Sequence, residues 1–216
     1  MPKATFFNLP EAKRQHIIEL ALAEFAENDF DQASISRIVA RAGIAKGSFY
    51  QYFENKEDLH AYLLALGAEA KAQFLKDNPP DPQMGTFAYI RWLSQAGIVF
   101  ELERPQLSQI AYRAVRSGTL PKEMQALAKA GSTSFFRQLV EQGQAHGDID
   151  ATLDPDLAAF FFNVIFNELG SYLIHRLQQG DGGANGRSLF ETPEAAHLFN
   201  QALHILASGL GAKEPT

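Results

Sequence analysis

Residues 34–58 of the chain read SISRIVARAGIAKGSFYQYFENKED, and this stretch decides the fold. Ser34 stands where a hydroxyl can accept hydrogen bonds from the free amides of a helix that we expect at about 35–42. Gly43 follows at once, as is typical where a helix ends in a tightly turned or left-handed residue. A second helix is expected over about 45–53. The stretch therefore predicts a helix-turn-helix.

The residues inside this turn suit the close packing of two helices. In a helix-turn-helix the first helix supports the second in the major groove of DNA, where the N-terminal residues of the second reach base edges. The two helices can touch only if the residues between them are small or apolar, as Val39, Gly43, Ile44 and Phe49 are. We therefore expect sequence-specific DNA binding.

The outward positions of the motif carry polar side chains that can read bases. We assign Gln51 and Ser48 to base edges, because a side-chain amide can pair bidentately with adenine and a hydroxyl can serve several bases. Ser36 and Arg37, at the start of the first helix, are secondary candidates.

Other outward residues are predicted to bind phosphate, which positions a protein on DNA but carries little sequence information. Lys46 and the free amides near Gly47 should reinforce each other, because helix N-termini attract anions. Tyr50, Tyr52 and Lys56 are further expected phosphate ligands. The alternative is that the two lysines are solvated surface cations. The complete predicted DNA-binding set is Ser34, Ser36, Arg37, Lys46, Gly47, Ser48, Tyr50, Gln51, Tyr52 and Lys56.

The positive charge of the motif is local. The whole chain has 19 Lys and Arg against 25 Asp and Glu, a formal net charge of -6, which argues against a protein that coats nucleic acid by bulk attraction. Residues 32–53 nevertheless contain Arg37, Arg41 and Lys46 and no acidic residue. Any DNA contact must therefore be confined to one small face.

Composition also limits the class of protein. The 216 residues include no cysteine, which excludes a disulfide framework, a thiolate zinc site and a cysteine nucleophile. Residues 1–15 lack the apolar core of a signal peptide, and the longest strongly apolar run, at 157–166, is too short to span a bilayer. We therefore expect a soluble, cytoplasmic protein that does not contact the membrane.

Helical periodicity dominates the chain, and no convincing alternating strand is present. The first helix is expected at 9–27, with Asn8 and Glu11 as a capping box and Pro10 in its first turn. The sequence NPPDP at 78–82 is the clearest helix breaker. The fold class is therefore predicted to be all-α.

We expect two domains. Residues 1–55 form a three-helix domain that contains the helix-turn-helix, residues 56–77 a connecting helix, and residues 78–216 a larger helical domain. The helices expected after the helix-turn-helix cover 56–76, 84–103, 105–117, 121–145, 155–179 and 193–210.

The helix-turn-helix resembles the N-terminal DNA-binding domain of TetR-family transcriptional regulators. In that family an Ala-Gly-apolar turn and a Gly-x-x-Tyr-x-aromatic-Phe recognition helix precede a Lys-Glu pair. The resemblance covers about residues 9–65, and Ala45 departs from it where the family often has a capping Ser, at a cost of up to about 1 kcal/mol. The matching residues are Ala42, Gly43, Ile44, Gly47, Tyr50, Tyr52, Phe53, Lys56 and Glu57.

The resemblance implies a homodimer in which the last two long helices of each subunit form a four-helix interface. It also implies a C-terminal domain with a cavity for a small, apolar effector, and a repressor that leaves a palindromic operator on double-stranded DNA when the effector binds. The effector would tilt the connecting helix and change the separation of the two recognition helices, which requires tighter binding to the DNA-incompetent arrangement.

The helix expected at 155–179 gives this reading separate support. It is apolar nearly all round at 157–166, so it needs cover on more than one side. Polar residues within it need partners, which could be a ligand, another subunit or each other. Its phenylalanines could equally form a plain hydrophobic core. The predicted ligand-binding residues are Trp92, Tyr112, Arg113, Asn163, Asn167, Glu168 and Tyr172, with Tyr89 and His175 as further candidates.

An enzyme and an architectural DNA-binding protein are the competing interpretations. The chain contains no HExxH, GxSxG, P-loop or GxGxxG pattern. His197 and His204 lie on the last expected helix but lack further ligands for a metal. The long C-terminal region and the acidic total disfavour an architectural protein. We therefore predict no catalytic residue, metal or cofactor; the alternative is an all-helical small-molecule-binding protein or enzyme with a vestigial helix-turn-helix.

Overall fold

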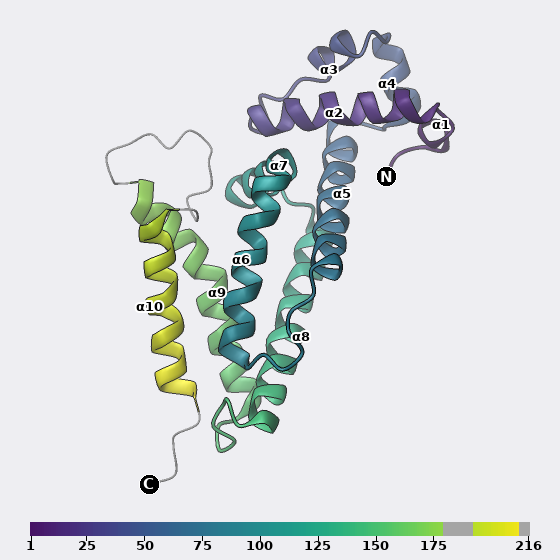
Figure 1. The fold of residues 1–216 in the computed structure, drawn as a ribbon. Helices are drawn as coiled ribbons and strands as arrows, with labels where there is room; N and C mark the ends of the chain where they lie inside the picture. Colours follow the sequence, from purple (N-terminus) through teal and green to yellow (C-terminus); the bar gives the residue numbers. More distant parts are fainter. Residues whose placement is uncertain (179–191, 212–216) are drawn as a thin grey trace. The chain divides into compact units, whose positions relative to one another are not determined.

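The computed structural model describes residues 1–178 and 192–211, except for some side chains between 167 and 178. The described residues are mainly helical (Figure 1), so the all-α prediction is confirmed. One isolated antiparallel bridge joins Ile149 and Gly211. The helices of the described residues are α1 (Ala4–Phe7), α2 (Glu11–Glu27), α3 (Ile35–Arg41), α4 (Lys46–Tyr52), α5 (Lys56–Asp77), α6 (Thr86–Glu103), α7 (Pro105–Ser117), α8 (Lys122–His146), α9 (Pro155–Gln178) and α10 (Pro193–Leu210).

Two predicted helix ends of the helix-turn-helix are confirmed. The Ser34 hydroxyl accepts a hydrogen bond from the amide of Arg37 at 3.4 Å, which caps α3. Gly43, just after α3, has a φ of +63°. Both features depend only on neighbours along the chain, which is why sequence alone identifies them.

The start of α2 differs from the prediction. Asn8 does not cap α2 but ends the short helix α1, and Pro10 occupies the position before the first residue of α2. The predicted capping box is therefore wrong. The physical reason is that Phe6 is fully buried, which draws the residues around it into a helical turn of their own.

Contacts divide the chain into two compact units. The first comprises residues 1–77 and 100–122, and the second residues 78–99 and 123–216. The chain therefore passes between the units three times, and the sequence analysis anticipates only the passage after residue 77. Helix α7 belongs to the same unit as the helix-turn-helix, where it packs against α2 and α5.

The first unit has an apolar core that includes residues of α2, α3, α4 and α5. Phe25 of α2, Ile38 of α3, Phe49 of α4 and Leu63 of α5 are each at most 2% exposed. Full burial of such a side chain stabilises the fold by about 1.5–3 kcal/mol. The inward faces of α3 and α4 thus hold the motif, and their outward residues remain available for contacts.

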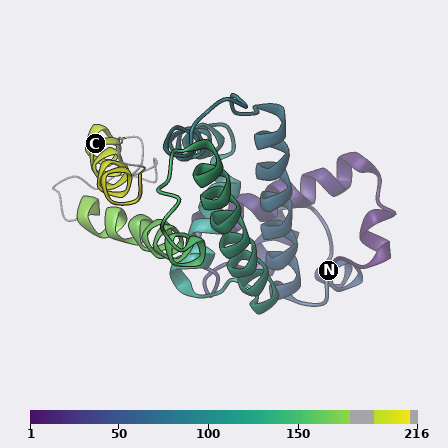
Figure 2. The same ribbon diagram turned by 90° about the horizontal axis from the view of Figure 1, so that it is seen from below.

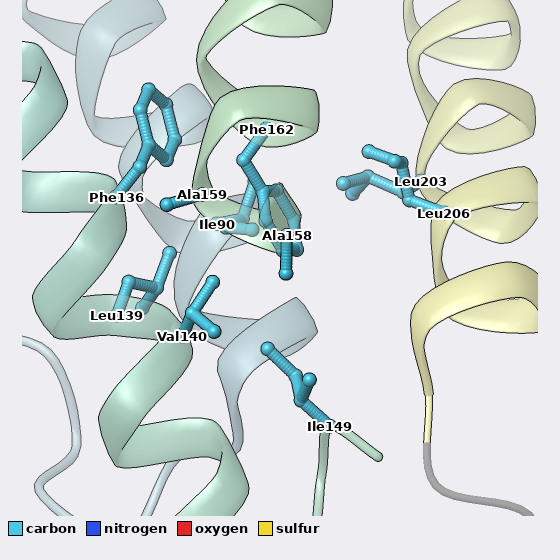
Figure 3. Close-up of a cluster of buried hydrophobic side chains, with 10 residues drawn as sticks. All are labelled: Ile90, Phe136, Leu139, Val140, Ile149, Ala158, Ala159, Phe162, Leu203 and Leu206. Atoms are coloured by element: carbon cyan, nitrogen blue, oxygen red, sulfur yellow. The ribbon is translucent and has the colours of Figure 1, made fainter. Parts of the chain in front are cut away.

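The second unit has its own core among α6, α8, α9 and α10. Figure 3 shows Ile90 of α6, Phe136 and Val140 of α8, Phe162 of α9 and Leu203 of α10 within this cluster. The rings of Phe136 and Phe162 are stacked with centroids 6.1 Å apart. Helices α9 and α10 lie side by side (Figure 2), so the last two long helices form one layer of this unit.

A glycine in α8 permits a close approach in the second unit. A Cβ atom added to Gly143 would lie 2.4 Å from Oγ1 of Thr86 and 2.9 Å from Cδ1 of Ile149. Thr86 is itself fixed, because its amide and hydroxyl donate to the Asp148 carboxylate at 2.8 and 3.1 Å. A Cβ atom added to Gly131 of the same helix would meet no described atom within 4 Å.

We expect the Gly143→Ala substitution to lower the free energy of unfolding by about 1–3 kcal/mol, because overpacking forces fixed neighbours apart. Gly131→Ala is the matched control and should raise the free energy of unfolding by about 0.5–1 kcal/mol through helix propensity. Urea denaturation followed by circular dichroism measures both. Equal effects of the two substitutions would contradict the close approach at Gly143.

Candidate nucleic-acid interface

Backbone hydrogen bonds fix the junction between α3 and α4. The amide of Gly43 donates to the carbonyl of Ala40 at 3.3 Å, and the amide of Ile44 donates to the carbonyl of Val39 at 3.1 Å. The positive φ of the glycine makes this arrangement possible without steric strain. Val39 and Phe49 are buried at 5% and 2% exposure. The turn therefore sets the direction in which α4 leaves α3.

Several predicted DNA-binding residues remain accessible on this motif. Tyr50 keeps 46% of its surface exposed although it is aromatic. Ser48 is half-buried. An exposed cation, an amide side chain and a phenol thus share one short helix, which is the chemistry that major-groove contacts require. The exposed members of the predicted set are Ser36, Arg37, Lys46, Gly47, Tyr50 and Gln51.

Glu24, which the sequence analysis did not single out, lies buried beside the start of α3. Its carboxylate accepts hydrogen bonds from the amide of Ser34 at 2.8 Å and from Nε of Arg37 at 2.9 Å. Burial alone would raise the pKa of Glu24, but the hydrogen bonds from Arg37 and Ser34 outweigh it and lower the pKa below its ordinary value. Glu24 follows Ile17 and Ala21 at helical spacing on the buried stripe of α2, and that position is the sequence signal for its role.

Arg37, a secondary candidate for base contact, has partners inside the protein. Its guanidinium forms an ion pair with Glu24 and donates to the carbonyl of Gln32 at 2.7 Å. A buried carboxylate therefore neutralises its charge and fixes its direction. Two other cations of the motif, Arg41 and Lys46, are exposed, and Arg41 is a candidate DNA contact that the sequence analysis counted but did not assign.

Lys56, which is predicted to bind phosphate, donates to three carbonyls of the protein. Its ammonium donates to the carbonyls of Phe30, Asp31 and Ala33 at 2.7, 3.3 and 3.1 Å, and it lies 4.6 Å from the ring centroid of Phe30. An ammonium has three hydrogens to donate, so these bonds use its donor capacity. Lys56 thus holds residues 28–33, which we call the α2–α3 segment.

Tyr52, which is predicted as a phosphate contact, packs inside the first unit. It is 7% exposed, and its ring centroid lies 6.0 Å from that of Phe6. Phe6 in turn contacts the rings of Phe53 and Tyr62 at 4.8 and 5.8 Å. The end of α4 is therefore anchored in an aromatic cluster.

Arg113, predicted to line a ligand cavity, binds the end of α2 within the first unit. Its Nε donates to the carbonyl of Ala26 at 3.0 Å, and its guanidinium forms an ion pair with Asp29, which Arg116 approaches at 3.4 Å. Ligand contact by Arg113 stays a prediction. Arg113 of α7 and Lys56 of α5 hold the α2–α3 segment together.

His60 is a buried titratable residue beneath the same segment. It is 4% exposed, and its ring centroid lies 5.0 Å from those of Phe25 and Phe30. Burial, reinforced by the charge of Lys56, lowers the pKa of His60 to about 4, although Glu57 opposes the shift. The neutral imidazole therefore stabilises the fold at neutral pH, and this contribution is lost as the pH falls from about 6.5 toward 4.

Two of the residues predicted to bind ligand have partners in the second unit. Trp92 is half-buried, and its ring centroid lies 5.4 Å from that of Tyr89. Oδ1 of Asn163 accepts a hydrogen bond from the Ser132 hydroxyl at 2.7 Å. The ring contact lies within α6, whereas the hydrogen bond joins α8 to α9 and gives the polar group of Asn163 a partner inside the protein.

Two of the other candidates on α9 are exposed. Glu168 is exposed, and Tyr172 is 51% exposed. The side chains of Asn167 and His175 lie outside the described residues. Ligand contact by this group stays a prediction.

Tyr112 and a residue that the sequence analysis missed, Glu101, each have a buried polar atom in the first unit. The hydroxyl of Tyr112 and Oε2 of Glu101 have no hydrogen-bond partner among the described residues. Such atoms cost free energy unless a further group satisfies them. They are therefore the strongest structural indication of a place for a bound molecule.

His197 and His204 are both exposed on α10. Within residues 1–178 and 192–211, no three His, Cys, Asp or Glu side chains gather as they would around a metal ion. In the same part of the chain, no helix has both the length and the apolar character needed to cross a bilayer.

Two family models match the chain. Residues 17–63 match the model described as bacterial regulatory proteins, tetR family, and residues 84–211 match the model described as tetracyclin repressor-like, C-terminal domain. The first match includes α3, α4 and the start of α5, and the second spans more than half of the chain. The matches thus cover both ends of the predicted architecture.

Individual proteins support the same relationship. A solved TetR family transcriptional regulator from Chloroflexus aurantiacus J-10-FL is 45% identical, with a TM-score of 0.74, over 99% of this chain and 100% of that chain. The HTH-type transcriptional repressor DhaR from Mycobacterium sp. (strain GP1) is 28% identical over 68% of this chain and 75% of the relative. The fatty acid metabolism regulator protein of Bacillus subtilis is 41% identical, but over only 30% of this chain and 31% of the relative.

We expect Lys56→Met to weaken DNA binding and to lower the free energy of unfolding by about 1–3 kcal/mol, because the α2–α3 segment loses its donor. The dependence of binding on salt should stay unchanged, since no phosphate contact is removed. Lys46→Met is the matched control: it removes an exposed cation from α4 and should reduce the salt slope by about one without destabilising the protein. Fluorescence anisotropy at several salt concentrations and thermal unfolding measure both. A reduced salt slope in Lys56→Met would restore its predicted phosphate role.

Proposed function

The chain belongs to the TetR family of bacterial regulatory proteins, and we propose that it represses transcription from a palindromic operator until a small effector binds. Its family makes it a DNA-binding transcriptional regulator. The observation that carries the DNA-reading part is the exposed face of α4, on a motif fixed by Gly43 and Glu24. We place its site of action in the cytoplasm, where the operator DNA is.

The proposed division of labour on α4 follows from residue chemistry. Gln51 reads a base, since its exposed amide can both donate and accept, and half-buried Ser48 assists it. Lys46 lies at the start of α4, where an ammonium and free backbone amides attract the same phosphate. Gly47 leaves room for the close approach of a phosphate, and Tyr50 offers a hydroxyl to the DNA backbone.

The Gln51→Ala substitution should weaken the free energy of binding to the preferred duplex by about 1–3 kcal/mol. It should also relax the base preference at one position of each half-site. The preferred duplex is obtained by selection from random DNA with the full-length protein. The exposed Gln142 of α8 supplies the matched control, Gln142→Ala, which should bind as the parent does.

Two results would count against this assignment. An unchanged base preference in Gln51→Ala would remove Gln51 from the readout. A parent protein that selects no sequence at all would favour the competing interpretation, a helical ligand-binding protein whose helix-turn-helix is vestigial.

The exposed apolar residues of α9 support a homodimer. Four apolar residues of α9 recur at helical spacing and are exposed in the single chain: Leu157 (55%), Phe160 (58%), Phe161 (46%) and Val164 (42%). Ile205 of α10 is 70% exposed. Soluble monomers rarely leave such a stripe uncovered. We propose that α9 and α10 pair with the same helices of a second copy. Two recognition helices about 34 Å apart would then read the two halves of a palindrome.

The unpartnered atoms of Glu101 and Tyr112 support a role in effector binding. A carboxylate oxygen needs a donor, and a phenol can donate or accept. The effector is therefore proposed to carry a hydroxyl, amide or amine group on its apolar body, which is more specific than the apolar effector expected from sequence. The buried Phe100 precedes Glu101 in α6 and packs against Phe74 with ring centroids 5.6 Å apart, so apolar side chains adjoin Glu101 along the helix.

We expect Tyr112→Phe to keep the operator affinity of the parent and to weaken the response to effector by about tenfold, the worth of one buried hydrogen bond. A panel of small alcohols, amides and amines is tested for release of fluorescent operator duplex. The control is Gln142→Ala, because that exposed side chain of α8 is not among the predicted ligand-binding residues. If no compound releases the duplex, the effector part of the proposal is wrong. If Tyr112→Phe responds as the parent does, Tyr112 does not bind the effector.

A further inference from the structure

The C-terminal end of α4 is completed by residues from the start of the chain. The last four carbonyls of any α-helix lack partners inside the helix. In α4 the first of these, the carbonyl of Phe49, accepts from the amide of Phe53 at 2.9 Å. The other three are bound by residues 1–8, which we call the N-terminal arm.

Lys3 and Thr5 provide the three remaining hydrogen bonds. The Lys3 ammonium donates to the carbonyl of Tyr50 at 2.8 Å, and the Lys3 amide donates to the carbonyl of Tyr52 at 2.8 Å. The Thr5 hydroxyl donates to the carbonyl of Gln51. The arm therefore satisfies successive carbonyls of the final turn, and it does so largely from side chains.

Helix α4 needs this support more than a longer helix would. It has seven residues, and helices of that length are marginal without tertiary contacts. It ends in the extended residue Phe53 rather than in a left-handed glycine, and its own last turn has no basic residue. Lys3 supplies from the arm the positive charge that favours a helix C-terminus.

The arm has an anchor that is separate from these polar contacts. Phe6 is fully buried against Phe53 and Tyr62, whereas Lys3 and Thr5 are exposed. Removing the Thr5 hydroxyl thus leaves the aromatic cluster intact. The hydrogen bonds can be tested without dismantling the core.

We propose that Lys3 and Thr5 are positioning residues for DNA recognition, because they fix the turn of α4 from which Tyr50 and Gln51 project. The inference rests on the proposed function, in which those two residues contact DNA. Without the arm contacts, the last turn of α4 frays and only a fraction of molecules hold the DNA-competent geometry. The apparent affinity falls by that fraction.

The test uses full-length Thr5→Val, which removes the hydroxyl at nearly constant shape, and Thr5→Ser, which keeps it. Thr5→Val should bind the selected palindromic duplex about three- to tenfold more weakly, the range set by one hydrogen bond. Its affinity for random duplex and its salt slope should stay unchanged. Amide hydrogen exchange of Tyr52 and Phe53 should accelerate in the free protein. Thr5→Ser should restore the parent values in every measurement.

A matched control separates positioning from general stability. Ala12→Gly, at an exposed position of α2, costs a comparable amount of stability through helix propensity and should leave the preference for the palindrome unchanged. Equal losses of preference in Ala12→Gly and Thr5→Val would overturn the proposal.

The remaining outcomes are also decisive. If the Lys3→Met variant binds all duplexes more weakly and its salt slope is reduced by about one, Lys3 is a direct phosphate ligand. That result would overturn its positioning role. Unchanged hydrogen exchange in Thr5→Val would overturn the proposal even if the parent reads its palindrome normally. A parent that prefers no duplex would refute the proposed function instead, and the positioning role with it.

Discussion

The helix-turn-helix depends on hydrogen-bond donors for the carbonyls at the end of α2 and in the segment between α2 and α3. Each of these carbonyls would cost about 1–3 kcal/mol if it were buried without a donor. Cationic side chains of α3, α5 and α7 meet the need. Arg113 of α7 binds the carbonyls of Ala26 and Glu27, Lys56 of α5 those of Phe30, Asp31 and Ala33, and Arg37 of α3 that of Gln32. The position of α3, and with it α4, follows from this set of bonds.

Sequence predicts the features of the site that depend on near neighbours. Ser34 and Gly43 mark the ends of α3 because a cap and a left-handed residue act within a turn of the chain. The roles of Lys56 and Arg113 could not be predicted in this way. Their carbonyl partners at Phe30 and Ala26 lie 26 and 87 residues away in sequence, so no local pattern indicates these bonds.

The same distinction applies to the larger architecture. Helical periodicity predicts the helices of both units, but it cannot say with which unit α7 packs. The contacts with α2 and α5 place it beside the helix-turn-helix. Tyr112 and Arg113 are consecutive residues of α7, one with an unsatisfied hydroxyl and the other bound to the α2–α3 segment. In the proposed function, an effector that binds the Tyr112 hydroxyl contacts α7, which is the helix that holds the α2–α3 segment. Effector binding can therefore affect the helix-turn-helix directly through α7.

Helix α4 is held by its buried face and by its main chain, and this has an evolutionary consequence. Phe49 and Tyr52 anchor it inward, while the arm binds its carbonyls, which are the same for every amino acid. The outward side chains of Lys46 and Gln51 are exposed, and substitutions at such positions usually change stability by less than about 0.5 kcal/mol. A duplicated copy of this gene could therefore exchange those side chains and acquire a new operator while its fold stays intact. The atoms of α4 on which the fold depends are therefore different from the side-chain atoms that can change when a new operator is recognised.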